Sequence, residues 1–205
     1  MSKIKDYLDR QGKCIEIPNV GRNDLPEFFK ENGFSVGVEI GVYRGEYTEL
    51  LAKSGMKIYG VDPWLAYDGY PYHGTDEEQP AHNKNYEETK KRLVPYTNVT
   101  LIRKTSMDAL KDFEDESIDF CYIDGNHSFR YVADDMCEWI KKIKKGGFLC
   151  GHDYIYANPL SFHVRHVVDA YVQAHAIQSL WILGEKHAKK GETRDSWRSW
   201  LIRKV

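Results

Sequence analysis

The feature that most constrains the fold is an apolar segment that enters a glycine-containing turn, followed by a second apolar segment that ends in an acid. Residues 38–45 read Val-Glu-Ile-Gly-Val-Tyr-Arg-Gly, and residues 58–64 read Ile-Tyr-Gly-Val-Asp-Pro-Trp. A strand, a Glu-x-Gly-x-x-x-Gly turn and a second strand with a terminal acid about twenty residues later are typical of a βαβ unit that binds an adenosine-containing cofactor. The pattern therefore predicts a parallel α/β sheet and a nucleotide-type ligand.

Three residues of this unit are candidate ligand-binding positions. Gly41 can adopt main-chain angles closed to other residues and lets the backbone approach a ligand, whereas Gly45 permits close packing where the next helix begins. Asp62 is placed to accept hydrogen bonds from both hydroxyls of a ribose. The alternative is a helix-capping turn and an ordinary strand-end acid. Ligand binding is favoured because all three features occur together and in order.

The rest of the chain alternates short apolar runs, which predict strands, with segments of helical periodicity. The predicted strands cover 36–40, 57–62, 99–102, 117–124, 148–150, 180–183 and 197–202, and the predicted helices cover 46–54, 84–94, 132–143 and 164–174. Since no helix separates the last two strands, they should form an antiparallel hairpin. The expected fold is a seven-stranded, mostly parallel Rossmann-like α/β sheet with helices on both faces.

Length and composition favour one domain over residues 1–205, because 205 residues with 41% hydrophobic content can build a sizeable core. Residues 34–205 form its predicted core. Residues 1–33 are expected to form a helical N-terminal extension, with a short helix around Pro26. The polar, aromatic stretch 64–83 has the length of an active-site lid.

Charge and hydropathy exclude several classes of partner. The net charge is −2 and no long basic block occurs, which argues against nucleic-acid binding. No apolar segment reaches the length of a signal peptide core or a membrane span, so a cytoplasmic protein is expected. The four cysteines form no Cys-x-x-Cys pair, so buried free thiols are expected in preference to a zinc site or disulfides. The oligomeric state is left open, a homo-oligomer included.

Four segments carry a resemblance to a known family: residues 39–45, 61–64, 123–128 (Ile-Asp-Gly-Asn-His-Ser) and 146–154 (Gly-Gly-Phe-Leu-Cys-Gly-His-Asp-Tyr). Together they resemble the class I S-adenosylmethionine-dependent methyltransferases. Within that class they are most similar to the branch that includes the macrocin-type sugar O-methyltransferases. The likeness spans about residues 34–203 in order, and the first 30 residues lie outside it.

The resemblance implies roles for individual residues. Glu39 and Gly41 would line the methionine end of S-adenosylmethionine, with Asp62 at the ribose and Ser106 at the adenine. Asp124 would border the cofactor and, with Asp153, bind a divalent cation, and His127 would be the general base. Two carboxylates suit Mg²⁺, which can orient a hydroxyl group and lower its pKa, and a histidine can take the released proton. The implied reaction is Mg²⁺-assisted O-methylation of a small hydroxylated acceptor such as a sugar.

Other interpretations of single residues stay open. Asp124 followed by Gly125 is also a common turn pair. His152 is interpreted as a packed side chain in preference to a metal ligand. Asp134 and Asp135 are expected to face solvent or to form local salt bridges. A third metal ligand could come from the 64–83 stretch, which offers Asp68, Asp76, Glu77 and Glu78.

Two rival functions share parts of the pattern. A dinucleotide-dependent oxidoreductase would use the same βαβ unit, but Glu39 takes the place of the second glycine of Gly-x-Gly-x-x-Gly, and its carboxylate would repel a pyrophosphate. A noncatalytic cofactor-binding domain would bind the cofactor without transferring a methyl group. Cofactor affinity that survives the loss of His127 and Asp124, with no methyl transfer, would favour it.

Overall fold

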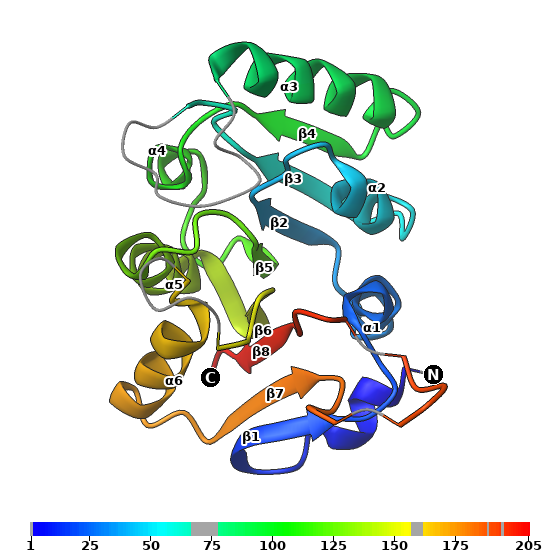
Figure 1. The fold of residues 1–205 in the computed structure, drawn as a ribbon, viewed down its shortest axis with the longest axis vertical. Helices are drawn as coiled ribbons and strands as arrows, with labels where there is room; N and C mark the ends of the chain where they lie inside the picture. Colours follow the sequence, from blue (N-terminus) through cyan, green and yellow to red (C-terminus); the bar gives the residue numbers. More distant parts are fainter. Residues whose placement is uncertain (1, 67–77, 157–161, 188, 194) are drawn as a thin grey trace.

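A computed structural model describes residues 2–66, 78–156, 162–187, 189–193 and 195–205 of the chain. Among these residues, eight strands form one sheet in the order β1-β7-β8-β6-β5-β2-β3-β4 (Figure 1). The strands are β1 (Gly12–Ile17), β2 (Val36–Ile40), β3 (Lys57–Val61), β4 (Val99–Ile102), β5 (Ile118–Ile123), β6 (Ile143–Gly151), β7 (Ser179–Leu183) and β8 (Trp200–Arg203). The α-helices are α1 (Leu25–Glu31), α2 (Glu46–Ala52), α3 (Gln79–Leu93), α4 (Ser106–Ala109), α5 (Phe129–Lys142) and α6 (Val164–Ala174), with 3₁₀ helices η1 (Lys3–Tyr7), η2 (Arg22–Asp24) and η3 (Leu110–Asp112).

The topology confirms the predicted fold class. The paired strands are parallel except for β8, which runs antiparallel to both β6 and β7. The predicted antiparallel C-terminal pair is therefore present. Because the other strands run parallel, the turns that follow β2, β3 and β5 meet at one edge of the sheet, where the predicted site residues lie.

The sheet has one strand more than the seven predicted. β1 lies in the N-terminal segment and pairs in parallel with β7 at the sheet edge. The sequence Gly-Lys-Cys-Ile-Glu-Ile gives it little apolar signal, since only Ile17 is fully buried along it. Residues 1–33, expected to form an N-terminal cap or helical extension, thus also contribute a strand, and α1 forms where the helix near Pro26 was predicted.

Several other elements also differ from the prediction. α3 begins at Gln79, so the last part of the expected 64–83 loop is helical. Residues 67–77 of that loop, which include Asp68, Asp76 and Glu77, lie outside the described residues. β6 begins at Ile143, directly after α5, and is longer than the predicted strand 148–150. The short helix α4, which no periodicity signals, follows β4.

Helices cover both faces of the sheet, with α4, α5 and α6 on one face and α1 and α2 on the other (Figure 1). Met136 and Trp139 of α5 are fully buried in the core of the first face. On the second face Phe29 stacks on Phe120 of β5 at 3.9 Å between ring centroids. Each such buried side chain contributes roughly 1.5–3 kcal/mol. Within the described chain, no helix combines the length and apolar character needed to cross a bilayer.

Candidate active site

A cavity of about 440 Å³ opens at the edge of the sheet where β2, β3 and β5 end. This volume lies within the range of small-molecule sites. Five of the predicted site residues line it: Gly41, Asp62, Ser106, Asp124 and His127. Parallel strands direct their carboxyl ends to the same edge, so residues far apart in the sequence meet around one space.

Asp62 is held by the backbone of the turn that follows β2. The N–H groups of Val42 and Tyr43 both donate to Asp62 Oδ2 at 2.9 Å, and the N–H of Trp64 donates to Oδ1 at 2.7 Å. Burial raises the pKa of Asp62, and these three amides partly offset that effect. A carboxylate accepts about four hydrogen bonds in all, so one acceptor position remains, on Oδ1. This position can accept from a ligand hydroxyl, and the contact of Asp62 with both hydroxyls of a ribose stays a prediction.

The structure explains why position 41 requires a glycine. Its φ is +88°, and a Cβ at this position would lie 2.2 Å from the carbonyl oxygen of Asp124. The turn after β2 thus lies against the backbone that follows β5. Gly41 therefore brings the two predicted halves of the site into direct contact, in addition to lining the cavity.

Glu39 and Gly45 do not line the cavity as the described residues define it. Glu39 is buried under the turn, where the Thr48 hydroxyl donates to its carboxyl group. Burial raises the pKa of Glu39 to about 8, so the carboxyl group is protonated at neutral pH. Gly45 has φ +75° at the start of α2, and a Cβ there would meet Thr89 of α3 at 2.9 Å. Both residues therefore pack behind the turn after β2 and do not line the cavity.

Asp124 and His127 follow β5, and Asp153 follows β6. His127 Nε2 lies 2.7 Å from Asp153 Oδ2 and 4.0 Å from Asp124 Oδ1. Burial alone would lower the pKa of His127, but the two carboxylates outweigh it and raise the pKa to about 9. The adjacent histidines hold the pKa of Asp153 well below its usual range, although burial opposes this. The structure therefore brings together the predicted base and both predicted metal ligands.

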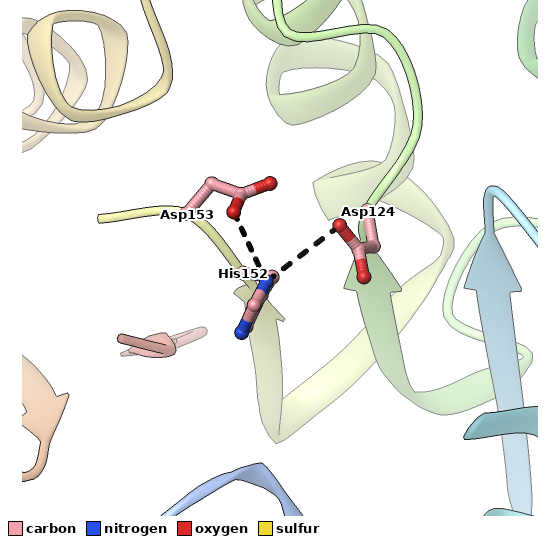
Figure 2. A group of neighbouring side chains, drawn as sticks. All are labelled: Asp124, His152 and Asp153. Atoms are coloured by element: carbon pink, nitrogen blue, oxygen red, sulfur yellow. Dashed lines mark ion pairs between the residues drawn. The ribbon is translucent and has the colours of Figure 1, made fainter. Parts of the chain in front are cut away.

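His152 joins this group, although it was interpreted as a packed side chain. Its Nδ1 points between the two carboxylates (Figure 2), 3.1 Å from Asp153 Oδ1 and 3.9 Å from Asp124 Oδ1. Asp124, His152 and Asp153 offer ligand atoms that all lie within 4.8 Å of one another. His127 Nε2 is buried without a well-aligned hydrogen-bond acceptor, which is what a site built to hold a cation would leave. Two carboxylates and an imidazole fit a divalent metal ion.

Ser106 lines the cavity and has a buried acid beside it. Its hydroxyl donates to Asp135 Oδ1 and accepts from Trp139 Nε1 at 2.7 Å. Asp135 is only 5% exposed, so the expectation that it faces solvent is wrong. Burial raises its pKa to about 7. Both residues line the cavity.

More than half of the chain matches a known protein family. Residues 38–154 match the methyltransferase domain family. The chain belongs to this family. Among curated proteins, this methyltransferase domain is 30% identical over 124 residues to an uncharacterized protein of Sinorhizobium fredii, which covers 57% of the chain and 13% of that protein. It is also 30% identical over 123 residues to an uncharacterized protein of Acanthamoeba polyphaga mimivirus, covering 57% of the chain and 50% of that protein. The chain thus spans half or less of the length of these relatives.

Solved structures share the fold of this methyltransferase domain. The O-methyltransferase from Bacillus cereus in complex with SAH has a TM-score of 0.60 at 15% identity, with 89% of this chain and 80% of that chain covered. The O-methyltransferase TomG from Streptomyces achromogenes has a TM-score of 0.61 at 12% identity, with 90% and 79% covered. An rRNA methylase from Streptococcus thermophilus has a TM-score of 0.60 at 15% identity, with 88% and 94% covered. The expected methyltransferase fold is confirmed, and the macrocin-type branch stays a prediction.

One charged residue at the site was not found by sequence reasoning. Arg22 Nη1, from η2 in the N-terminal segment, lies 3.3 Å from Asp124 Oδ2. The two residues are 102 positions apart, and Arg22 precedes the matched range 38–154. No motif surrounds Arg22, so only the tertiary arrangement reveals this contact. The N-terminal segment therefore contributes a cation beside a predicted metal ligand.

Proposed function

We propose that this protein is an S-adenosylmethionine-dependent methyltransferase that methylates a hydroxyl oxygen of a small acceptor with the help of a divalent cation. The observation that supports this most strongly is that Gly41, Asp62, Asp124 and His127 open into one cavity. One ligand can therefore touch the ribose-type acid and lie within reach of the base. Fold neighbours that bind SAH or methylate oxygen support the same proposal.

The chain's own groups position the cofactor. In this proposal the free acceptor position of Asp62 Oδ1 takes one ribose hydroxyl, while the three amides already bound keep the carboxylate oriented. Glu39 is less suited to meet the cofactor's amino group, because its carboxyl group is buried beside Thr48 and burial raises its pKa to about 8. That group would instead find Asp124, which lines the cavity across from Gly41.

The acceptor side holds the groups for proton removal. When bound, a divalent cation orients the acceptor oxygen, lowers the pKa of its hydroxyl, and offsets the carboxylate charge that raises the pKa of His127. Asp124, His152 and Asp153 would hold it. His127 Nε2 would take the hydroxyl proton, and the stacked Phe162 ring, 4.4 Å away between centroids, keeps the imidazole in place.

A sugar-like acceptor is supported by the aromatic rim beside His127. Trp197 packs edge-on against Phe162 at 5.0 Å between ring centroids and remains 41% exposed. A half-exposed indole presents an apolar face together with a polar N–H, which suits a ring that carries hydroxyl groups. The net charge of −2 supports a small-molecule acceptor over a nucleic acid.

Two measurements test this proposal. Isothermal titration calorimetry should show micromolar binding of S-adenosylhomocysteine and none of NAD⁺. Labelled S-adenosylmethionine, incubated with a panel of sugars and nucleotide sugars and with Mg²⁺ or Mn²⁺, should transfer its methyl group to at least one of them. Binding of NAD⁺ in preference to S-adenosylhomocysteine would contradict the proposal and favour an oxidoreductase. Cofactor binding without transfer, unchanged by His127→Ala, would favour the noncatalytic alternative.

A further inference from the structure

The segment that carries Arg22 reaches the site because of the direction of β1. β1 runs parallel to β7, and β7 and β6 both run antiparallel to β8. β1 therefore points the same way as β6, and the chain that follows it emerges at the carboxyl edge of the sheet, where Asp124 lies. Arg22 begins η2, which is the next helix after β1. The edge strand thus places a cation of the N-terminal segment at the site.

Three tertiary contacts fix the position of Arg22. Its backbone N–H donates to Asp195 Oδ2, and its carbonyl oxygen accepts from the Tyr47 hydroxyl at 3.1 Å. Its guanidinium carbon lies 5.2 Å from the centroid of the Tyr47 ring. The guanidinium group is therefore presented by an anchored backbone, which lowers the entropy that a ligand contact would cost.

The Arg22 side chain keeps most of its hydrogen-bonding capacity. A guanidinium group has five N–H donors. Among the described residues, its one hydrogen bond runs from Nη1 to Asp124 Oδ2, at 3.3 Å. The side chain is 34% exposed, and none of its nitrogens belongs to the buried atoms that lack a partner, so the remaining donors reach solvent. An oxyanion can therefore bind to Arg22 without breaking the contact with Asp124.

The two oxygens of Asp124 face different partners. Oδ1 lies 4.0 Å from His127 Nε2 and 3.9 Å from His152 Nδ1, on the side of the proposed base and cation. Oδ2 faces Arg22, which, like His152 and Asp153, borders the site without lining the cavity. One carboxylate group thus separates Arg22 from the proposed reaction centre. An acceptor whose hydroxyl lies at the cation can place a neighbouring substituent at the guanidinium group.

The segment that anchors Arg22 also carries the aromatic rim. Asp195 binds the backbone N–H of Arg22, and two residues later Trp197 packs against Phe162. Phe162 in turn stacks on His127. Arg22, Asp195 and Trp197 all lie outside residues 38–154, which match the methyltransferase domain family. A group that they recognise would therefore belong to the acceptor, and not to the cofactor that the family shares.

We propose that Arg22 binds an oxyanion of the acceptor, so that this protein methylates a hydroxyl group of an acidic sugar. This inference rests on the proposed function and narrows its acceptor class. The planar guanidinium group would bind a carboxylate or a phosphate, while Trp197 covers the sugar ring. A neutral sugar would leave these donors unused. The oxyanion takes no part in the transfer, in which the methyl group passes to the hydroxyl oxygen, the electron pair of the broken C–S bond stays on sulfur, and the hydroxyl proton goes to His127.

The rival role for Arg22 is to neutralise Asp124 until a cation binds. In that case the guanidinium group and the cation compete for the same carboxylate. Arg22→Gln would then raise Mn²⁺ affinity and leave the choice between acidic and neutral sugars unchanged. The two roles are therefore separated by the selectivity for the acceptor.

The test is isothermal titration calorimetry of the protein saturated with S-adenosylhomocysteine and Mg²⁺. The ligands are a panel of hexuronates and hexose phosphates, each compared with its neutral hexose. At least one acid should bind ~10-fold more tightly than its neutral counterpart, because hydrogen bonds between charged groups are stronger than neutral ones. Hexuronates and hexose phosphates distinguish a carboxylate from a phosphate as the recognised group.

Three variants assign the preference to one side chain. Arg22→Gln should abolish most of the preference for the acid, and Arg22→Lys, which keeps the charge but not the planar fork, should retain part of it. Arg10→Gln is the matched control. Arg10 also lies over a tyrosine ring, at 3.8 Å from the Tyr7 centroid, but it precedes β1 at the opposite edge of the sheet. Its substitution should leave the preference unchanged.

Two results would overturn the assignment of Arg22 and leave the proposed function intact. One is S-adenosylhomocysteine binding with no acid bound more tightly than its neutral hexose. The other is a preference for the acid that persists in Arg22→Gln. Failure of the unaltered protein to bind S-adenosylhomocysteine would overturn the proposed function itself and the assignment with it.

Discussion

The proposed cofactor side and the proposed acceptor side of the site differ in how completely their polar groups are satisfied. On the cofactor side, three backbone amides bind Asp62, and the turn at Gly41 is locked against the segment after β5. On the acceptor side, two carboxylates converge on His127 and His152, and buried imidazole nitrogens lack aligned partners. On the first side the chain itself supplies the hydrogen-bond partners of the polar groups. On the second side a bound cation or acceptor would have to supply them.

The largest effect should come from removing one carboxylate of the acceptor side. Asp124→Asn takes away a negative charge from the group that would hold the cation, so Mn²⁺ affinity should fall strongly and methyl transfer should fall by ~10²- to 10³-fold. S-adenosylhomocysteine affinity should fall by a smaller factor than Mn²⁺ affinity, since Asp124 is only one of the proposed cofactor contacts and Asp62 is left intact. Calorimetry with each ligand separates the two effects.

The control for that substitution is Asp115→Asn, which removes an exposed acid paired with Lys142 far from the cavity lining. It should leave Mn²⁺ affinity and transfer unchanged. An Asp124→Asn variant that lost both ligands equally would mean that the two halves form one interdependent unit, and the contrast between them would fail.

A somewhat smaller effect is expected from the cofactor side. Asp62→Ala removes the acceptor of three backbone N–H groups as well as the proposed ribose contact. S-adenosylhomocysteine affinity should fall by ~100-fold, about 2.7 kcal/mol, and the melting temperature should drop because the turn loses its support. Mn²⁺ affinity should stay within a few-fold. Unchanged cofactor affinity would show that Asp62 serves only the turn.

The contrast also separates what the sequence could predict from what it could not. The cofactor side follows from local rules, because a strand, a glycine turn and a strand-end acid lie within 25 residues, 38–62. Gly41 and Asp62 were predicted from this pattern, and Asp124 and His127 from the family resemblance; all four line the cavity. The mostly parallel sheet and the antiparallel C-terminal pair follow from the same alternation of elements.

The parts that sequence reasoning missed depend on distant contacts. Arg22 reaches Asp124 from a segment without a motif. His152 was interpreted as a packed side chain, and Asp135 as facing solvent or forming a local salt bridge. The sequence alone does not show which way a side chain points or what is buried beside it. β1 was missed because an edge strand with one buried face and polar residues leaves a weak apolar pattern.

The acceptor side can be examined further through its choice of cation. His152 supplies nitrogen to an otherwise oxygen-based group, and imidazole favours Co²⁺, Fe²⁺ and Zn²⁺ over Mg²⁺. His152→Asp should therefore lower the ratio of Co²⁺ to Mg²⁺ affinity by ~10-fold, measured by calorimetry with S-adenosylhomocysteine present. His175→Gln, at the exposed end of α6, is the control for adventitious binding. An unchanged ratio in His152→Asp would return His152 to a packing role.

The smallest effect is expected for Glu39, which is buried behind the turn after β2. This effect is on the pH dependence of stability. The pKa of Glu39 is raised to about 8 in the folded protein, mainly by burial, against 4.5 for the ordinary group. The unfolded chain therefore releases this proton at a lower pH than the folded chain, so the contribution of Glu39 to stability is full below about pH 4.5 and is lost as the pH rises to about 8. Glu39→Gln cannot ionise and keeps the acceptor for Thr48. Its melting temperature should fall less steeply than that of the unaltered protein between pH 5.5 and 7.5, by a few degrees over that interval. Parallel melting curves for the two proteins would mean that Glu39 is ionised in the fold, and the cofactor side would then hold an uncompensated charge like the acceptor side.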